Sequence, residues 1–240
     1  MKKLIAVSLC SFLMTACCAR RAAEPETAAS VMGERAMAVE PVSYDVKDNA
    51  IETIESCVAI AFRYPTFGNA AVDKRIEAFV NEEMEAMRGH LIPLCADLDP
   101  NIAADENGAK YAFGYFYEVL RADSEAIDIL FTGHDYTGGA HDNTWLRTFM
   151  FDPATGVVLP PLSVVDGDEA RAVEKLSEVS RVKLRETLDA SDVLESMIDE
   201  GTKPEAENFR KIVRTETGVR VYFDPYQVAP WSAGIVYIDL

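Results

Sequence analysis

The sequence predicts an α+β fold, with one or more antiparallel sheets that carry helices packed on one face. Segments with apolar residues at every second position occur in groups that are joined by short turns. Two long segments have the spacing of an amphipathic helix, and each separates one group of strands from the next. A doubly wound parallel sheet would need helices that alternate regularly with single strands, and the sequence lacks that pattern.

The first predicted elements are a strand and a helix. Residues 54–64 are largely apolar and alternating, and Pro65 follows them, which is typical of a strand that ends there. Residues 70–87 have apolar side chains three and four positions apart, so they predict an amphipathic helix that ends at Gly89. His90 follows that glycine, where a cationic side chain interacts favourably with the helix dipole.

A hairpin and another strand come next. Residues 110–120 and 126–132 are rich in aromatic and β-branched side chains, and Asp123 lies in the polar segment between them. This pattern predicts two strands joined by a hairpin turn. Residues 143–151 predict a further strand, which ends in the turn sequence Asp-Pro-Ala-Thr-Gly at 152–156.

The last third of the chain predicts two helices and a second group of strands. Residues 168–188 have the longest helical pattern, and residues 191–199 predict a shorter helix. Residues 209–223 then predict a hairpin that turns at Glu216, and residues 233–240 predict a final strand.

The N-terminal segment predicts a signal peptide, residues 1–16, that ends in a lipidation site. Lys2 and Lys3 precede an apolar run of about 11 residues, which is too short to span a bilayer. The sequence Met-Thr-Ala before Cys17 resembles the bacterial lipobox, in which the cysteine carries the lipid. Cys18 is a weaker candidate for lipidation, and an ordinary signal peptide cut nearby is the alternative.

The predicted lipid anchor leads to a division of the chain into three parts. Residues 1–16 form the leader, and residues 17–45 form a lipidated flexible tether that is rich in Ala, Glu, Arg and Pro. Residues 46–240 form an α+β envelope domain, as one core or as two closely packed subdomains, 46–130 and 131–240. We therefore expect an extracytoplasmic protein that is tethered to a bacterial membrane, at its periplasmic face or at the cell surface.

The net charge excludes one class of partner and favours another. The chain carries a formal charge of −17, and removal of Lys2 and Lys3 with the leader leaves 21 basic against 40 acidic residues. Such a surface repels nucleic acid and attracts cationic partners. The alternative is that the acidity serves only solubility.

Two cysteines remain in the predicted folded domain, Cys57 and Cys95. In an oxidising compartment they can form a disulfide, and closing the loop between them would stabilise the fold by about 4 kcal/mol on the chain-entropy model. Two separately buried thiols are the alternative. The sequence has no CxxC pair and no cysteine–histidine cluster, so it does not predict a structural zinc site.

The most distinctive segment is TGHDYTGGAHDNTW at 132–145. Gly138 and Gly139 allow a sharp backbone turn between two strands and a close approach by a ligand. His134, His141 and Asp142 are weak candidates for a metal site, because imidazole and carboxylate groups together can bind Zn²⁺. Hydrogen bonds from the histidines to the backbone of the loop are the more common explanation, and we predict no cofactor.

A second candidate segment lies before the last strand, where Tyr226, Pro230 and Trp231 form an aromatic loop. Aromatic side chains of this kind can stack on sugar rings or anchor a protein interface, or they can cover the end of a sheet. The candidate ligand-binding residues are Tyr136, Gly138, Gly139, His141, Asp142, Tyr226 and Trp231. No catalytic residue is predicted, because the sequence has no nucleophile elbow, P-loop or dinucleotide fingerprint.

These motifs together resemble a bacterial envelope domain of unknown function. The matching residues are Tyr136–His141, the strand and turn that end in Phe151-Asp152-x-x-Thr155-Gly156, Tyr64-Pro65, and the Pro-Tyr-x-x-Ala-Pro pattern within 223–234. The domain forms the extracellular, lysozyme-sensing part of RsiV-type anti-sigma factors and accompanies the catalytic domain of some peptidoglycan deacetylases. The resemblance spans about residues 50–240.

The resemblance implies a non-enzymatic binding module that engages a lysozyme-like wall hydrolase or a wall glycan. The chain shows neither the sigma-binding segment nor the membrane-spanning helix of an anti-sigma factor, and it has no room for a metal-dependent catalytic domain. Two other hypotheses stay open at this point. One is an envelope hydrolase or metal-dependent enzyme centred on His134, His141 and Asp142, and the other is a structural envelope lipoprotein.

Overall fold

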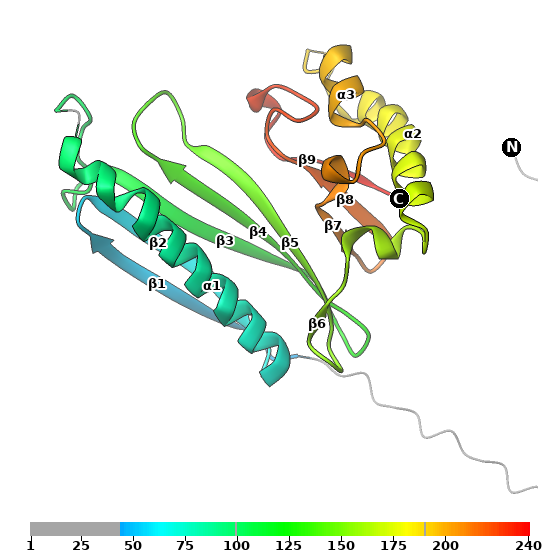
Figure 1. The fold of residues 1–240 in the computed structure, drawn as a ribbon, viewed down its shortest axis with the longest axis horizontal. Helices are drawn as coiled ribbons and strands as arrows, with labels where there is room; N and C mark the ends of the chain where they lie inside the picture. Colours follow the sequence, from blue (N-terminus) through cyan, green and yellow to red (C-terminus); the bar gives the residue numbers. More distant parts are fainter. Residues whose placement is uncertain (1–43, 99, 190) are drawn as a thin grey trace, which may run out of the picture. The chain divides into compact units, whose positions relative to one another are not determined.

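In a computed structural model, the protein is described over residues 44–98, 100–189 and 191–240. The predicted signal peptide, Cys17 and most of the predicted tether lie outside these residues. The described part has an α+β fold with two sheets, which confirms the predicted fold class (Figure 1). No helix in the three described ranges has the length and apolar character that crossing a membrane requires.

Six strands form the larger sheet, which we call sheet A, in the order β1-β2-β3-β4-β5-β6. Their bounds are β1 Lys47–Glu55, β2 Val58–Thr66, β3 Tyr111–Ala122, β4 Ile127–Tyr136, β5 Asn143–Asp152 and β6 Val157–Val158. All neighbouring strands are antiparallel except β2 and β3, which are parallel. The predicted antiparallel pairing thus holds for every neighbouring pair of sheet A except this one, because the helix between β2 and β3 returns the chain to the end of the sheet where β2 began.

The predicted strand at 54–64 is a hairpin in the structure. Strands β1 and β2 pair from Lys47↔Thr66 to Glu55↔Val58, with the turn at Ser56 and Cys57. Ser56 has φ 57°, a conformation that usually requires glycine or asparagine. The sequence has neither residue at this turn, so the hairpin gave no recognisable signal.

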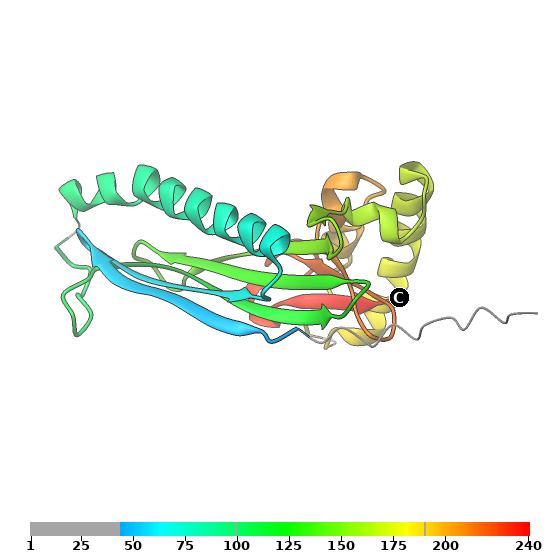
Figure 2. The same cartoon turned by 90° about the horizontal axis from the view of Figure 1, so that it is seen from below.

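The first helix, α1 (Ala70–His90), covers one face of sheet A (Figures 1 and 2). The Asn69 side chain caps its start by accepting hydrogen bonds from the Ala71 and Val72 N–H groups. The helix continues through Gly89, where the sequence predicted its end, because glycine inside a helix costs only about 1 kcal/mol relative to alanine. The residues that α1 buries against the sheet are Val72, Ile76, Phe79, Val80, Met84 and Met87.

The short 3-10 helix η1 (Ile92–Asp97) follows α1 and carries Cys95. In the structure Cys95 forms a disulfide with Cys57, at the turn between β1 and β2. Of the two arrangements that the sequence left open, the structure therefore has the paired one. The bond fastens the segment after α1 to the start of β2.

Three strands form the smaller sheet B in the order β7-β8-β9, with both pairs antiparallel. The bounds of its strands and helices are β7 Ile212–Arg214, β8 Val219–Phe223, β9 Val236–Asp239, α2 Glu169–Thr187 and α3 Glu195–Gly201. Three further 3-10 turns lie at η2 Pro161–Val164, η3 Ala206–Phe209 and η4 Trp231–Ala233. Helix α2 packs Leu176 and Leu184 against sheet B residues such as Val221 and Ile238.

The apolar side chains form two main cores and a smaller third one. The first core lies between α1 and sheet A, and the second lies between α2, α3 and sheet B. The third joins the two sheets, where Leu130, Leu146 and Met150 of sheet A pack with Val213 and Tyr222 of sheet B. Because successive strand residues point to opposite faces, sheet A therefore has an α1 face and a sheet B face.

The described residues belong to one compact unit. The expected boundary between subdomains at residues 130 and 131 falls inside β4, in the middle of sheet A. The chain instead passes from sheet A to sheet B after β6, which ends at Val158. The alternating pattern of β4 predicts a strand but does not show which sheet the strand joins, so the boundary was placed too early.

Candidate ligand-binding surface

Three of the predicted ligand-binding residues meet at one end of the two sheets. The imidazole of His141, from the loop after β4, stacks on Trp231 with ring centroids 4.4 Å apart and planes 19° apart. The Tyr226 hydroxyl lies 3.3 Å from His141 Nε2. Trp231 is 40% exposed and Tyr226 is 56% exposed, so their rings face solvent. We call His141, Tyr226 and Trp231 the aromatic cluster.

The cluster comes from two loops, one between β4 and β5 and one between β8 and β9, and each has residues with positive φ. Gly138 and Gly139 have φ 97° and 124°, and they turn the chain between β4 and β5. Tyr226 has φ 69°, which is unusual for a bulky residue and is found more often at binding sites. Asp142 lies beside His141, whose Nδ1 is 2.9 Å from the Asp142 carbonyl oxygen. Tyr136 supports the same loop through a bond from its hydroxyl to the Gly139 carbonyl.

The Tyr226 loop is fixed to sheet A through Asp224. The Asp224 carboxylate accepts a hydrogen bond from the Leu146 N–H at 3.2 Å and forms an ion pair with Lys211. The Asp224 N–H donates to the Gln227 side chain at 3.0 Å, and Gln227 in turn donates to the Gly201 carbonyl at 3.0 Å. These bonds hold the loop of Tyr226 and Trp231 next to the loop of His141.

His134 is separate from the aromatic cluster, although the sequence placed it in the same loop as His141. It lies in β4 and stacks on Phe116 of β3, with centroids 5.4 Å apart and planes 6° apart. Burial lowers the pKa of His134, although the negative charges of Asp142 and Asp135 oppose that effect. Phe116 is 50% exposed and was not among the predicted site residues.

The weak metal candidates His134, His141 and Asp142 do not form a set of ligands in the structure. Each histidine ring stacks on an aromatic ring instead. In the described ranges, no group of three or more His, Cys, Asp or Glu side chains could hold a metal ion. The hypothesis of a metal-dependent enzyme at this loop therefore gains no support from the geometry.

A groove of about 410 Å³ continues from Phe116 between the two sheets. Phe116 lines it on the sheet A side, and Tyr237 of β9, which is 43% exposed, lines it on the sheet B side. The guanidinium of Arg220 lies 3.9 Å from the centre of the Tyr237 ring, a cation–π contact. The groove thus combines half-exposed aromatic rings with charged groups, among them Arg220 and Glu118.

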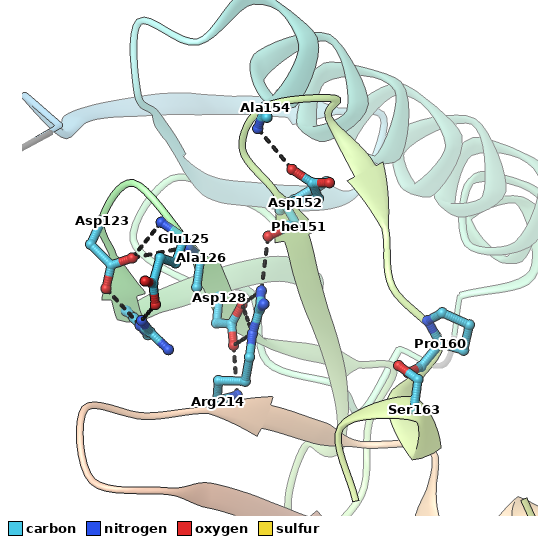
Figure 3. A network of polar contacts seen from close by, with 11 residues as sticks. Asp123, Glu125, Ala126, Asp128, Phe151, Asp152, Ala154, Pro160, Ser163 and Arg214 are labelled. Atoms are coloured by element: carbon cyan, nitrogen blue, oxygen red, sulfur yellow. Dashed lines mark hydrogen bonds and ion pairs between the residues drawn. The ribbon is translucent and has the colours of Figure 1, made fainter. Parts of the chain in front are cut away.

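A buried ion pair joins β4 of sheet A to β7 of sheet B (Figure 3). Arg214 of β7 donates from Nη2 and Nε to the two carboxylate oxygens of Asp128 in β4, at 2.6 and 2.9 Å. Its backbone N–H also donates to Asp128 at 2.6 Å, and its Nη2 donates to the Phe151 carbonyl at 2.8 Å. Asp128 is fully buried, and this burial raises the pKa of its carboxyl, whereas Arg214 opposes the rise. Sequence reasoning did not detect the pair, because its partners are 86 residues apart.

A family model matches the C-terminal part of the chain. Residues 165–240 match the family described as "Protein of unknown function (DUF3298)". The matched range starts just before α2 and contains all of sheet B, together with Tyr226 and Trp231. The loop of His141 lies in the part of the chain before this range.

Most of this chain is similar to part of a known enzyme. It is 28% identical over 175 residues to the peptidoglycan-N-acetylmuramic acid deacetylase PdaC of Bacillus subtilis (strain 168). These residues are 72% of this chain but only 35% of the relative, so the match covers about a third of that protein. The likeness to RsiV-type anti-sigma factors stays a resemblance.

Two crystal structures of DUF3298 proteins share the fold. One, from Pseudomonas aeruginosa PAO1, has a TM-score of 0.57 and 14% identity. The other, from Bacteroides fragilis NCTC 9343, has a TM-score of 0.51 and 16% identity. Both alignments cover 82% of this chain and 90% of the other. At these identities the comparison shows the fold alone.

Proposed function

We propose that the protein is a non-enzymatic binding module that works in the bacterial envelope, anchored to a membrane by a lipid on Cys17. The lipobox-like sequence before Cys17 and the similarity to a protein whose name is that of a peptidoglycan deacetylase support this location. The disulfide between Cys57 and Cys95 fits an oxidising compartment.

The observation that carries the binding function is the aromatic cluster. Two loops from different sheets bring three ring side chains together at the surface, and Asp224 fastens the Tyr226 loop to β5. Exposed aromatic residues on a rigid base are typical of the residues that dominate binding energy in protein interfaces. The cluster is therefore the proposed contact surface for a partner.

The charge of the chain indicates the chemistry of that partner. With a formal charge of −17, the protein attracts basic proteins, and Asp142 is the direct neighbour of His141 in the cluster. A lysozyme-like wall hydrolase with a basic surface meets this requirement. We therefore propose such a hydrolase as the first partner to test.

A wall glycan is the second candidate, because the groove between the two sheets offers aromatic rings on both of its sides. Phe116 and Tyr237 can stack against sugar rings, and Arg220 and Glu118 can bond with their hydroxyls. The glycan would lie along this groove and not on the aromatic cluster.

The two candidates are separated by calorimetric titration of the purified chain with basic lysozyme and with soluble wall glycan at low ionic strength. We expect Trp231→Ala and Tyr226→Ala to weaken lysozyme binding by at least about tenfold, as for interface anchor residues. Val182→Ala, an exposed apolar residue of α2, is the matched control and should bind like the wild type. Absence of binding to either ligand would overturn the proposal, and glycan turnover lost in His141→Ala would favour an enzyme instead.

The proposed lipid anchor has its own test. Mass spectrometry of the mature chain from bacterial membranes should find the acyl groups on an N-terminal Cys17. Cys17→Ser should release the protein from the membrane fraction, whereas Cys18→Ser should leave it anchored. A soluble wild-type chain cut at another position would refute the anchor but leave the binding surface unaffected. If neither ligand binds and the lipid is present, a structural role in an envelope assembly becomes the better hypothesis.

A further inference from the structure

A separate cavity of about 310 Å³ lies on the α1 face of sheet A, away from the aromatic cluster. Its walls come from the second half of α1 and from strands β3, β4 and β5. The residues that matter for its chemistry are Glu83, His90, Phe113, Asp135, Trp145 and Arg147. This volume is at the lower end of the range for small-molecule sites.

Strand register fixes where these side chains lie. Phe113 pairs with Asp135, and Gly133 pairs with both Tyr115 and Trp145. Arg147 lies two positions beyond Trp145 on the same face of β5, so Trp145 is between Asp135 and Arg147 along the cavity. Asp135 and Arg147 are four residues apart in register, or roughly 13 Å along the strands.

Trp145 is held in place by a chain of hydrogen bonds. Gly133 leaves space for the indole, since a Cβ at that position would lie 2.4 Å from Trp145 Nε1. The indole N–H donates to the Tyr115 hydroxyl at 2.5 Å, and that hydroxyl donates to Glu83 Oε2 at 2.8 Å. Burial raises the pKa of Tyr115, and the bond to Glu83 adds to the rise, so the phenol keeps its proton.

The cavity therefore has an apolar floor between two charged ends. Phe113 and Trp145 provide aromatic surface in the middle. Asp135 lies at one end, and its Oδ1 is fixed by a 2.7 Å hydrogen bond from Asn143. At the other end the Arg147 Nε is 3.8 Å from Glu83 Oε1, and half of the Arg147 side chain is exposed. His90 lies seven residues, or about two turns, beyond Glu83 on α1.

We propose that this cavity is a saccharide-binding site in which a pyranose ring stacks on Trp145 and its hydroxyls bond with Asp135, Glu83 and Arg147. A pyranose has an apolar C–H face for the floor and hydroxyl groups around its edge for the charged ends. An alkylammonium ion would find the two carboxylates but would be repelled by Arg147. A hydrocarbon would desolvate the charged ends without offering them hydrogen bonds.

The site is independent of the proposed function, because it lies on the opposite face of sheet A. Trp145 and Leu146 are successive residues of β5, and Leu146 packs toward sheet B. A partner on the aromatic cluster would leave the cavity open, and sugar bound in the cavity differs from glycan bound in the groove because it depends on Asp135 and Arg147, so the two proposals are tested separately.

The test measures the fluorescence of Trp145, which should change when a sugar stacks on its ring. The chain has two tryptophans, so Trp231→Phe leaves Trp145 as the only one. The full chain carrying Trp231→Phe is titrated with N-acetylglucosamine, with its β-1,4-linked dimer and with tetramethylammonium chloride. We expect a saturable change in Trp145 fluorescence with at least one sugar and none with the ammonium salt. Calorimetry of the wild-type chain with the same sugars provides a measurement that does not depend on the variant.

Two conservative variants locate the site. Asp135→Asn keeps an oxygen for the Asn143 bond, and Arg147→Gln removes the guanidinium; each should weaken sugar binding by about tenfold. Arg171→Gln, a change of an exposed arginine in α2, is the matched control and should leave the affinity unchanged. The proposal is overturned if calorimetry and fluorescence detect no sugar binding, if the ammonium salt binds as well as the sugars, or if Arg147→Gln binds like the control.

Discussion

Asp128 and Arg214 show most clearly how single residues connect the two sheets. The carboxylate is fully buried and accepts four hydrogen bonds from one arginine, three from its side chain and one from its backbone. Removal of one partner leaves the other buried without its counter-charge, which costs more than the net contribution of the intact pair. The fold therefore depends on the two residues together.

We expect Asp128→Asn and Arg214→Met each to lower the free energy of unfolding by about 3–5 kcal/mol in urea denaturation. The double variant Asp128→Leu with Arg214→Met should be more stable than either single variant, because it buries no unpaired charge. Arg185→Gln, which removes an ion pair exposed to solvent, is the control and should have a much smaller effect. A double variant less stable than both single ones would contradict this account.

His134 makes stability depend on pH in a direction that follows from its burial. The pKa of His134 is lowered in the folded state, so below about pH 6.5 the unfolded chain binds more protons than the folded one. Stability should therefore increase as the pH rises toward about 6.5, with a slope of at most about 1.4 kcal/mol per pH unit from this residue. Urea denaturation between pH 5 and pH 7.5 should show a smaller slope for His134→Gln, and equal slopes would refute the assignment.

At the scale of elements, the disulfide links the turn between β1 and β2 to the segment after α1. Its two cysteines are 38 residues apart, and closing such a loop stabilises a fold by about 4 kcal/mol on the chain-entropy model. Cys57→Ala with Cys95→Ala should therefore lose up to about 4 kcal/mol of unfolding free energy.

The wild-type chain under reducing conditions is the matched comparison for that double variant. A reducing agent should lower the wild-type stability to the level of the variant and leave the variant itself unchanged. If the reducing agent has no effect on the wild type, the cysteines do not form the bond that the structure shows.

The sequence predicted most elements of this fold because their patterns are local. The helix at 168–188, the hairpin between 110–120 and 126–132, and the turn at 152–156 are all present, with small shifts at their ends. The sequence predicts a single strand where β1 and β2 form a hairpin, because Ser56 makes the turn without glycine. The parallel pairing of β2 and β3 depends on how α1 packs, and a single sequence does not contain that information.

The sequence also predicts part of the candidate surface, because some of its features are local patterns. Glycine pairs and aromatic loops are visible in the sequence, so the sequence alone predicts His141, Tyr226 and Trp231 as site residues, and the structure adds their mutual contacts. Phe116, Arg220 and the cavity around Trp145 were missed, because each depends on strands that meet only in the folded chain.

At the scale of the whole molecule, the negative charge should control how fast a basic partner binds. The Debye length falls from about 10 Å at 0.1 M salt to about 3 Å at 1 M, so long-range attraction is screened as salt is added. Surface plasmon resonance with basic lysozyme should therefore give an association rate constant at least about tenfold lower in 0.5 M than in 0.02 M NaCl. A rate that does not change with salt would contradict electrostatic steering by this surface.

The position of β9 has a consequence for how the chain is made. Val236 and Ile238 contribute to the core of sheet B, and the Leu240 N–H bonds to the Val219 carbonyl. Because β9 follows β7 and β8 in the chain, sheet B lacks one of its three strands until β9 has left the ribosome. Arg214 likewise has its final place only once β7 and β8 are paired. The second half of the chain therefore stays without its complete apolar core until β9 is available to pair with β8.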